Sequence, residues 1–263
     1  MRLYLEVARR AFRRATVYRS AYIAGILTNA FFGALRSFVF IALYRATNEV
    51  AGFSLPDVLS YTWATQSLIS IGGGWIFGAD LMTSIRTGDV VTDLMRPWNF
   101  YGYWLSRSLG ERGFNLLVRG SLTYLIGVLY FGAHIPSPPQ LLTFAATIAL
   151  ALLVSFAFSF IVSLTAFWLI DNTGLLIIAN IMLSFFSGFL LPINFFPAWL
   201  AAIARALPFQ AITQLPAEAL LGRLSGVALR EALLLQAFWA FALTALALLL
   251  LRTAVQKVVV QGG

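Results

Sequence analysis

Residues that could carry out chemistry are few in this chain, and their spacing matches no common catalytic motif. Lys257 is the only lysine, so no G-x-x-x-x-G-K-S/T loop is present and the chain cannot hydrolyse ATP by itself in the P-loop manner. The H-E-x-x-H and G-x-S-x-G motifs are also absent. The single histidine, His134, falls in a turn rich in proline, where a solvated side chain is expected. We therefore predict no catalytic residue, no metal site and no cofactor bound by this chain.

Cysteine and glycine narrow the chemistry further. The chain has no cysteine, which excludes a disulfide framework, a thiolate nucleophile and a zinc-thiolate site. Gly72, Gly73, Gly74 and Gly78 resemble a phosphate-binding loop only superficially, because they lie within an apolar stretch. Two interpretations stay open for them: close packing of neighbouring helices, or a flexible point in a gating helix.

The composition indicates a membrane protein. Hydrophobic residues make up 60% of the 263 residues and charged residues only 11%, whereas soluble proteins average about 25% charged residues. No charged residue occurs between Gly120 and Ile170. The net charge of +8 comes from basic residues scattered along the chain, which argues against the basic groove of a nucleic-acid-binding protein. We therefore expect a polytopic membrane protein that contacts the lipid bilayer and no nucleic acid.

Apolar segments long enough to cross a bilayer define the expected fold. A helix needs about 20 apolar residues to span the hydrocarbon core, and no internal repeat or linker divides the chain. We predict a single all-α membrane domain over residues 1–263 with six transmembrane helices. The predicted spans are residues 21–44, 58–82, 113–131, 141–168, 174–192 and 232–251.

The distribution of arginine predicts the orientation of these spans. Basic residues gather in residues 2–19, in the passage between the second and third spans, and after the last span, at Arg252 and Lys257. The segments on the other side carry only a few arginines. The positive-inside rule therefore places both termini in the cytoplasm.

Residues 1–20 form a separate basic and amphipathic segment. Leu3, Val7, Phe12 and Tyr18 recur among the arginines, a pattern typical of a helix that lies in the membrane interface with its guanidinium groups toward anionic headgroups. The alternative is a disordered basic tail.

The charged passage over residues 84–112 offers most of the surface that a soluble partner could contact. Within it we predict a short helix over residues 88–97, with Asp89 as the N-cap and Pro97 at its end. Such a short helix is marginal in water and needs contacts with the membrane or a partner. A plain connector is the alternative, and the cytoplasmic placement favours a docking element. The apolar side of the helix would be Val90, Val91, Leu94 and Met95, with Asp93 and Arg96 exposed.

The outer segment, residues 193–231, is too long for a turn and too apolar for a solvated loop. Trp199, Ile203 and Leu207 have helical spacing, and Pro197 suits the start of a helix. We therefore predict a short helix that dips into the outer leaflet.

Three ionisable residues fall in or near the predicted spans. Arg36 lies about 12 Å of helix from Tyr44, so its side chain either snorkels outward or faces a protein-lined cavity or a subunit interface. Asp80 and Asp171 approach the ends of the second and fourth spans. They are either hydrated there or paired with Arg119 or an N-terminal arginine.

Three motifs carry a resemblance to a known family. They are IRTGDVVTDLMRP at residues 85–97, FPAWL at residues 196–200 and LPF at residues 207–209. Together with the basic start and the six spans, the chain resembles the permease subunits of type-2 ABC exporters (ABC-2), in particular a bacterial group in which two related permeases work with a separate ATPase. The resemblance covers nearly the whole chain. Arg36 within a span departs from the plainer members.

The resemblance implies roles for three segments. Residues 2–19 would be the connecting helix, residues 88–97 the coupling helix that rests on the ATPase, and residues 193–220 the re-entrant outer gate. The implied ATPase-coupling residues are Gly88, Asp89, Val91, Asp93, Leu94, Met95, Arg96 and Pro97. The implied gate residues are Phe195, Phe196, Pro197, Trp199 and Leu200.

By this resemblance the chain would be the permease of an ATP-driven exporter in the bacterial cytoplasmic membrane. It would form the path for an amphipathic or hydrophobic substrate, act as a dimer with itself or a related permease, and bind two ATPase subunits that hold ATP and Mg. An ion- or proton-coupled secondary carrier is the alternative, but Asp80 and Asp171 are too peripheral for the carboxylates that it needs. A membrane scaffold without transport would show the same spans.

Overall fold

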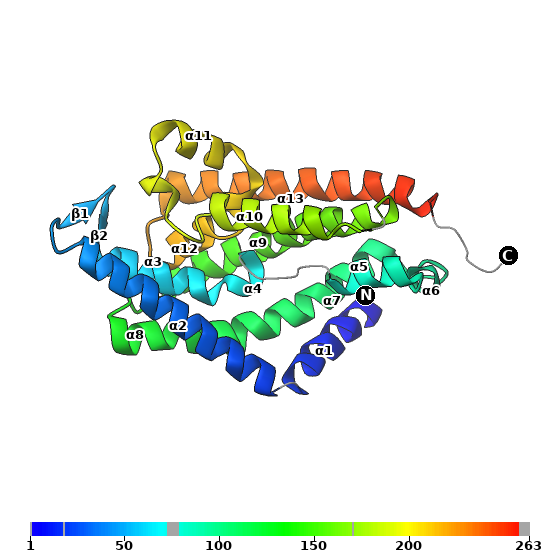
Figure 1. Ribbon diagram of the computed structural model, residues 1–263, viewed down its shortest axis with the longest axis horizontal. Helices are drawn as coiled ribbons and strands as arrows, with labels where there is room; N and C mark the ends of the chain where they lie inside the picture. Colours follow the sequence, from blue (N-terminus) through cyan, green and yellow to red (C-terminus); the bar gives the residue numbers. More distant parts are fainter. Residues whose placement is uncertain (1, 18, 73–78, 170, 258–263) are drawn as a thin grey trace.

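The computed structural model describes residues 2–17, 19–72, 79–169 and 171–257. These residues are mainly helical, and a two-stranded antiparallel hairpin of β1 (Glu49–Val50) and β2 (Phe53–Ser54) follows the first long helix. The long helices run roughly along the long axis of the molecule (Figure 1). We name the two ends of this bundle the α6 end and the α11 end, after the short helices that lie toward them.

Four helices are long and apolar enough to cross a membrane within the described part of the chain. They match four of the six predicted spans, so the chain is an all-α, multi-pass membrane protein. The second of them joins α7, a π-helical turn and α8 without a break. The first apolar segment, Tyr22–Leu43, belongs to α2 (Arg19–Leu43). The second, Phe100–Phe131, comprises α7 (Phe100–Phe114), the π-helix (Asn115–Gly120) and α8 (Ser121–Phe131). The third, Pro138–Phe167, comprises α9 (Pro138–Leu164) and a 3-10 turn (Thr165–Phe167), and the fourth, Gly226–Val255, is α13.

The other two predicted spans coincide with shorter helices. Residues 58–82 are distributed over α3 (Leu55–Ser67), α4 (Ile69–Gly72) and the start of α5 (Ala79–Thr87). Residues 174–192 hold α10 (Thr173–Phe186), whose 14 residues extend about 21 Å, less than the 30 Å of a hydrocarbon core. The count of six spans therefore stays a prediction. Gly72 ends α4, whereas Gly73, Gly74 and Gly78 lie outside the described residues.

The charged passage is more helical than predicted. After α6 (Val90–Leu94), α7 begins at Phe100, so the second long helix starts thirteen residues earlier than the third predicted span, which begins at residue 113. Asn99 fixes this start, because its side-chain oxygen accepts a hydrogen bond from the amide of Gly102 at 2.7 Å. The sequence interpretation placed the charged residues between 107 and 112 in a loop. They lie on α7 instead, and their side chains contact other residues of this chain.

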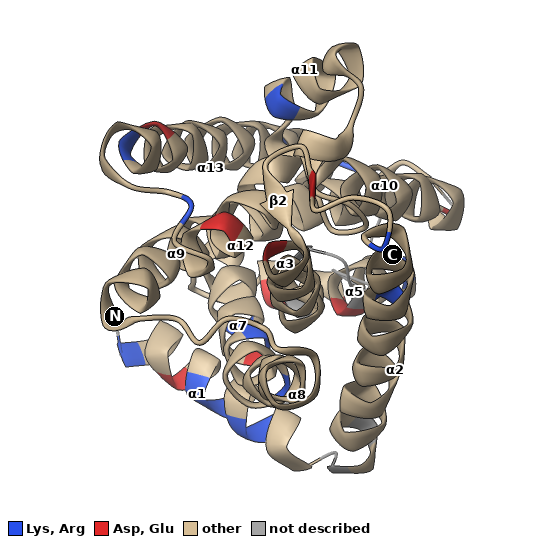
Figure 2. Ribbon diagram, turned by 90° about the vertical axis from the view of Figure 1, so that its left-hand side faces the viewer, with Lys and Arg blue, Asp and Glu red and all other residues tan. Residues whose placement is uncertain are grey.

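Helix α3 occupies the middle of the bundle (Figure 2). It starts with a capping box in which the Asp57 carboxylate accepts a hydrogen bond from the Ser54 amide at 3.0 Å. Its residues from Val58 to Ser67 are all buried. The largest buried side chain, Trp63, donates from its indole nitrogen to the Ser37 hydroxyl at 3.1 Å. An all-round buried helix of this kind fixes the relative positions of the helices that surround it.

Glycines let two helices approach the Trp63 ring. A Cβ atom at Gly33 of α2 would lie 3.0 Å from the ring, and one at Gly127 of α8 would overlap its Cγ atom. One turn further along the same face of α8, Phe131 packs against Trp63 with ring centroids 5.1 Å apart. Gly33 and Gly127 thus allow close helix packing at positions that the sequence analysis did not single out.

A second hydrophobic cluster holds the α6 end together. Leu81 of α5, Val90 of α6, Phe100 of α7 and Phe160 of α9 are buried in it. The C-terminal half of α13 also contributes, through Ala247 and Ala254. The short helices at this end are therefore packed on the long ones.

Helix α1 (Arg2–Val17) runs beside α7 with the same chain direction. The Tyr4 hydroxyl accepts a hydrogen bond from the Asn99 amide at 3.1 Å, and Phe12 meets Phe114 edge-on at 5.4 Å. Between these contacts, Gly110 lies directly against the Ala8 backbone. The predicted N-terminal helix is confirmed, and a disordered basic tail is excluded for these residues. Its place in the membrane interface stays a prediction.

Gly127→Ala should lower the free energy of unfolding, because the added methyl group has to displace the buried Trp63 ring. Overpacking of this kind costs about 1–3 kcal/mol. The matched control is Gly113→Ala in α7, where an added Cβ meets nothing within 4 Å. Thermal unfolding of the purified variants in one detergent, followed by tryptophan fluorescence, measures the difference. Equal melting temperatures for the two variants would contradict the close packing at Gly127.

Candidate functional site

The candidate coupling segment at the α6 end is a turn followed by one short helix. Gly88 has a positive φ of 83°, which allows the chain to reverse between α5 and α6. Asp89 occupies the N-cap position but does not cap the helix, because its backbone is helical (φ −59°, ψ −23°) whereas a capping residue is extended. Its carboxylate instead accepts a hydrogen bond from the Thr87 hydroxyl at 2.7 Å. The predicted helix is present, and the predicted cap is wrong.

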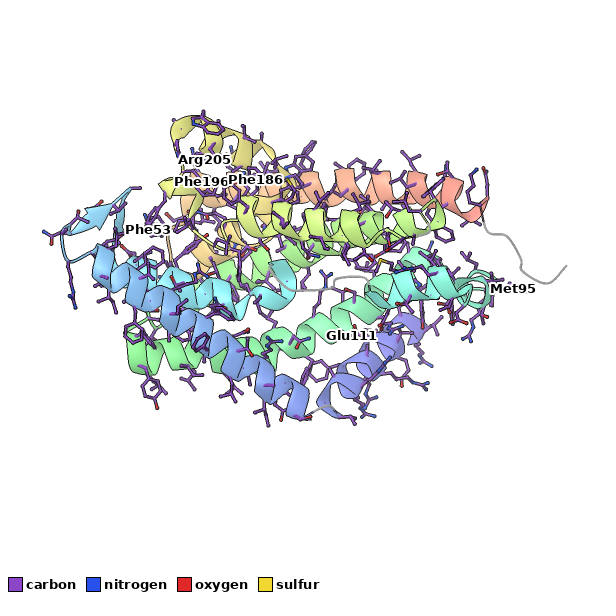
Figure 3. The ribbon with its side chains drawn as sticks, in the orientation of Figure 1. Phe53, Met95, Glu111, Phe186, Phe196 and Arg205 are labelled. Carbon is purple, nitrogen blue, oxygen red and sulfur yellow. The ribbon has the colours of Figure 1, made fainter. Side chains whose placement is uncertain are left out.

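The predicted apolar side of α6 divides into a buried and an exposed part. Val90 is buried in the cluster at this end, and Leu94 packs against the same cluster while half-buried. Val91 is also half-buried. Met95 is 82% exposed and projects from the end of the bundle (Figure 3). The most exposed apolar side chain of this helix, and the one available to a partner, is therefore Met95, whereas Val90 and Leu94 hold the helix in place.

Charged and aromatic residues surround Met95. The Arg96 guanidinium lies 4.9 Å from the centroid of the Trp98 ring, which stacks on Tyr103 at 4.6 Å. Partial burial raises the pKa of the Asp93 carboxyl above its ordinary value, and the charges of Arg96 and Arg107 oppose this shift. Pro97 is exposed and follows α6.

Ion pairs connect the helices at the α6 end. Arg107 of α7 pairs with Asp80 of α5 and with Glu111 at 3.4 Å. Arg86 pairs with Asp171 at 3.4 Å. The predicted partners for the two aspartates, Arg119 or an N-terminal arginine, are therefore wrong. Arg119 lies about 18 Å further along the same helix than Arg107, too far to reach Asp80.

Two arginines of the long α7–α8 helix are turned into the bundle. Arg112 is buried and donates to the hydroxyls of Ser155 and Ser159 of α9, at 2.8 Å and 3.1 Å. Arg119 donates to the Gly25 carbonyl at 3.2 Å and to the Asn29 side-chain oxygen at 3.0 Å. The sequence interpretation counted Arg112 among the charges of the cytoplasmic loop. Serines spaced four residues apart in the α9 sequence were the signal that could have located its partners.

The outer segment contains the predicted short helix. It comprises a 3-10 turn (Ile193–Phe195), α11 (Ala198–Ala206), a second 3-10 turn (Pro208–Ala211) and α12 (Gln214–Leu220). Pro197 is the residue immediately before α11, as predicted. Figure 1 shows α11 standing away from the long helices, at one edge of the molecule.

The predicted gate residues do not act as one group in this structure. Phe195 packs edge-on against Phe53 at 5.6 Å, and Phe196 stacks on Phe185 of α10 at 5.2 Å. Trp199 is 67% exposed. Leu200 is half-buried and Pro197 exposed. Phe195 and Phe196 therefore pack the outer segment against the rest of the chain, whereas Trp199 faces outward.

Arg36 meets the backbone of the turn after α10. Its Nη2 atom donates to the carbonyls of Phe189 and Leu190 at 2.8 Å and 2.7 Å. The guanidinium also lies 5.5 Å from the centroid of the Phe189 ring. In this structure Arg36 is therefore held by protein rather than reaching outward along α2.

Tyr61 and Gln214 hold the same turn from the other side. The Tyr61 hydroxyl lies 2.7 Å from the Gly188 carbonyl and within hydrogen-bond distance of the Gln214 side-chain oxygen. The backbone amide of Gln214 donates a hydrogen bond to the Ser187 carbonyl at 2.9 Å. Gly188 has a φ of 79° and no room for a Cβ atom beside these side chains. We call Arg36, Tyr61 and Gln214, with the turn over residues 187–193, the turn clamp.

The turn clamp continues into an acidic residue of α12. The Gln214 side-chain nitrogen donates to the Glu218 carboxylate at 2.6 Å. Burial raises the pKa of the Glu218 carboxyl, and the hydrogen bond from Gln214 and the charges of Arg223 and Arg205 oppose this shift. The sequence interpretation identified Arg36 but missed Tyr61, Gly188 and Gln214. A polar glutamine inside the apolar outer segment was the available signal.

No group of three histidine, aspartate or glutamate side chains that could hold a metal ion occurs among the described residues. What the geometry provides is mechanical: an exposed side chain at one end, a clamped turn at the other, and packed helices between them.

Comparison with known families identifies the chain at the family level. Residues 31–262 match the model for the ABC-2 family transporter protein. This match covers most of the sequence, so the chain belongs to the ABC-2 transporter family, as its motifs indicated. A comparison with curated proteins and one with solved structures found no match. The chain is therefore an ABC-2 permease, of a family that is in general not catalytic.

Tyr61→Phe should weaken the turn clamp without changing the packing of the ring. Removal of the hydroxyl leaves the buried Gly188 carbonyl without this partner, which costs about 1–3 kcal/mol of unfolding free energy. Tyr130→Phe is the control, because Tyr130 is 78% exposed. Thermal unfolding in detergent compares the two variants. A melting temperature for Tyr61→Phe equal to that of Tyr130→Phe would show that the clamp contributes no stability.

Proposed function

We propose that this permease is the membrane half of an ATP-driven exporter and that a separate ATPase supplies its energy. The observation that carries the proposal is the exposed Met95 on a short helix that is packed firmly on the long helices. A helix of five residues has little stability of its own. Its attachment to the cluster at the α6 end makes it a solid contact point rather than a flexible connector.

The packing supports a mechanical connection from α6 to the rest of the bundle. Val90 shares a cluster with residues of α5, α7 and α9, so a displacement of α6 moves these helices with it. The helix from Phe100 to Phe131 has 32 residues and a length of about 48 Å, which spans the bundle. At its far end Phe131 packs on Trp63 of α3.

Helix α3 completes the connection to the turn clamp. Tyr61 lies only two residues from Trp63 on the same buried helix and contacts the turn at Gly188. A rocking of the long helices would therefore change the position of the turn clamp and of the neighbouring Phe195 and Phe196. Alternation between two such arrangements is the transport cycle that we propose.

The proposed exporter contains a second permease, either identical or related, and two ATPase subunits that bind ATP and Mg. Residues 88–97 would rest on the ATPase, with both termini in the cytoplasm and the chain in a bacterial cytoplasmic membrane. Exposed apolar side chains on α10, among them Ile177, Ile178 and Ile181, support a lipid-facing or permease-facing surface there. An amphipathic or hydrophobic substrate suits a path between such surfaces.

A proton-coupled carrier is less consistent with the distribution of carboxylates. Such carriers place Asp or Glu near the middle of the membrane. In this chain the acidic residue nearest the middle of a long helix is Glu111, which pairs with Arg107 at 3.4 Å, and Asp80 and Asp171 lie exposed at the α6 end. The basic residues inside the bundle cannot release a proton easily, because arginine stays charged. A scaffold without transport is tested by the ATPase experiments below.

Met95→Asp should weaken association with the ATPase about tenfold or more, because a carboxylate would be forced into an apolar contact without a partner. Folding should be unaffected, since Met95 is exposed. The measurement is copurification and binding of the ATPase, encoded with the permease, to detergent-solubilised variants. Leu94→Asp is a poorer probe, because Leu94 also packs within the chain.

The matched control for Met95→Asp is Ile135→Asp. Ile135 is 73% exposed, and it lies in the turn after α8, at the opposite end of the α7–α8 helix from α6. The Ile135→Asp substitution adds the same charge on the outer side of the membrane in the proposed orientation, where a cytoplasmic ATPase cannot bind. Normal ATPase binding by Met95→Asp, or equal losses in both variants, would remove the main support for coupling through α6.

Phe196→Ala and Trp199→Ala should separate packing from exposure in the outer segment. Phe196→Ala removes the ring stacked on Phe185, and it should raise passive leak of a small fluorescent dye from proteoliposomes. Trp199→Ala should leave the leak unchanged, because its side chain is largely exposed. Neither change should affect ATPase binding. A leak that follows Trp199→Ala instead would assign the closing contact to α11 in the assembled transporter.

A further inference from the structure

The turn clamp contains a glutamine whose side chain connects a carboxyl group to both ends of the clamped turn. Gln214 lies on α12, a short helix that packs against α9 and α3 (Figure 2). Its side-chain nitrogen donates to the Glu218 carboxylate at 2.6 Å. Its side-chain oxygen accepts a hydrogen bond from the Ile193 amide at 3.2 Å and lies within hydrogen-bond distance of the Tyr61 hydroxyl. The exporter mechanism proposed above gives Glu218 no role.

The donors and acceptors around Gln214 fix the orientation of its side-chain amide. The Ile193 backbone N–H can only donate, so the atom that faces it is the oxygen. The nitrogen then faces Glu218, where an ionised carboxylate is a pure acceptor and makes a strong, charge-assisted hydrogen bond. The ionised form of Glu218 therefore holds Gln214 in the orientation that serves Ile193.

Tyr61 has one hydrogen for two acceptors. Its hydroxyl lies 2.7 Å from the Gly188 carbonyl and beside the Gln214 side-chain oxygen. A hydroxyl group carries a single donor hydrogen, so these two acceptors compete for it. Reversal of the Gln214 amide would turn its nitrogen toward Tyr61, and the hydroxyl would then donate to Gly188 alone. The same reversal would deprive the Ile193 amide of its acceptor.

A protonated Glu218 permits this reversal. A neutral carboxyl group carries one O–H donor, which would bond the Gln214 oxygen once that oxygen faces Glu218. The two protonation states thus hold different ends of the turn. The ionised form supports Ile193 at its C-terminal end, and the protonated form supports Gly188 near its N-terminal end.

Burial moves the protonation of Glu218 toward neutral pH. It raises the pKa of the carboxyl above the ordinary 4.5, although the hydrogen bond from Gln214 and the charges of Arg223 and Arg205 oppose the shift. The protonated form therefore accumulates at a higher pH than it does in an exposed glutamate.

Other ionisable side chains near α12 come from neighbouring elements. Arg223 pairs with the Asp57 carboxylate of α3 at 3.7 Å, and Arg36 contacts the turn from α2. Helix α9 carries no charged residue. The arginines stay charged and Tyr61 stays neutral at acidic pH, whereas Asp57 caps the start of α3. The change of charge at the turn clamp therefore arises at Glu218.

We propose that Glu218 is a proton-binding switch of the turn clamp, and that its protonation reverses the Gln214 amide and transfers the hold on the turn from Ile193 to Gly188. Glu218 lies at the α11 end, which faces outward in the proposed orientation, so the external pH would set the state of the turn. The consequence for transport rests on the proposed exporter function. Release of Ile193 would loosen the packing of Phe195 and Phe196, which follow it directly.

The test uses the purified permease alone, without ATPase or ATP, so that its outcome is independent of the exporter function. Hydrogen exchange in heavy water, resolved to single amides by mass spectrometry, gives the protection factor of the Ile193 amide after correction for intrinsic exchange at each pH. In the wild type this factor should fall about fivefold, the equivalent of one hydrogen bond of about 1 kcal/mol. The fall should occur between neutral pH and 4.5, because the pKa of the Glu218 carboxyl is raised above this value.

Three variants locate the titrating group and the relay. Glu218→Gln should make the Ile193 protection factor independent of pH, because the titrating carboxyl is gone. Glu231→Gln removes an exposed carboxyl near the start of α13 and should keep the wild-type pH dependence. Gln214→Met should abolish the pH dependence at Ile193 but retain the infrared C=O band of protonated Glu218. That band is identified by its absence from Glu218→Gln.

The backbone amide of Gln214 is a control within the same molecule. It donates to the Ser187 carbonyl at 2.9 Å, a bond that the switch does not involve, so its protection should not change with pH. Equal losses at Ile193 and at this amide would show opening of the whole clamp and overturn the switch. A constant Ile193 protection factor in the wild type, or an equal pH dependence in Glu218→Gln, would also overturn it. Failure of the exporter proposal would instead appear in ATPase binding and leave these measurements unchanged.

Discussion

The constraint on which the structure depends is the absence of water in the hydrocarbon core, where every polar group needs a partner within the protein. Three arginines lie in the long helices and donate hydrogen bonds across helix boundaries, while Arg36 Nη1 and Arg119 Nε find no acceptor among the described residues. Arg36 binds carbonyls of the turn after α10, Arg112 binds hydroxyls of α9, and Arg119 binds a carbonyl and a side-chain amide of α2. Because a guanidinium group stays charged and costs several kcal/mol when it lacks partners, each of these contacts restrains the separation of two helices.

Small residues make these polar contacts possible. The Arg119 guanidinium lies so close to α2 that a Cβ atom at Gly25 would overlap it. Arg119 itself belongs to the π-helical turn over residues 115–120, whose wider winding interrupts the α-helical register of the long helix. Gly127 gives the same freedom to Trp63 one level further along α8. Close backbone approach and polar satisfaction therefore occur together on this helix, as is usual where lipid removes the hydrophobic drive for helix association.

The sequence predicted the elements that local physics determines. Four apolar segments became long helices, and the arginine-rich periodicity of residues 2–17 and the proline at 197 correctly marked two short ones. The start of α7 at Phe100 was missed, because charges on a helix look like a loop when their partners are unknown. Asp89 was taken for a cap that its backbone angles do not allow. The partners of Arg36 are 153 and 154 residues away, and no local pattern contains such contacts.

Helix α3 explains how two distant candidate sites can influence each other. Residues i and i+2 on a helix point to nearly opposite sides, so Tyr61 faces the clamped turn whereas Trp63 faces α2 and α8. Because α3 is buried from Val58 to Ser67, it has no free surface along which to slide. A tilt of the α7–α8 helix must then either carry α3 with it or open the contact at Trp63. The first outcome moves the turn clamp directly, and the second leaves a large buried ring without its partner. The packing thus favours motion of α3 and the long helix as one body, with the deformation concentrated in the turn at Gly188.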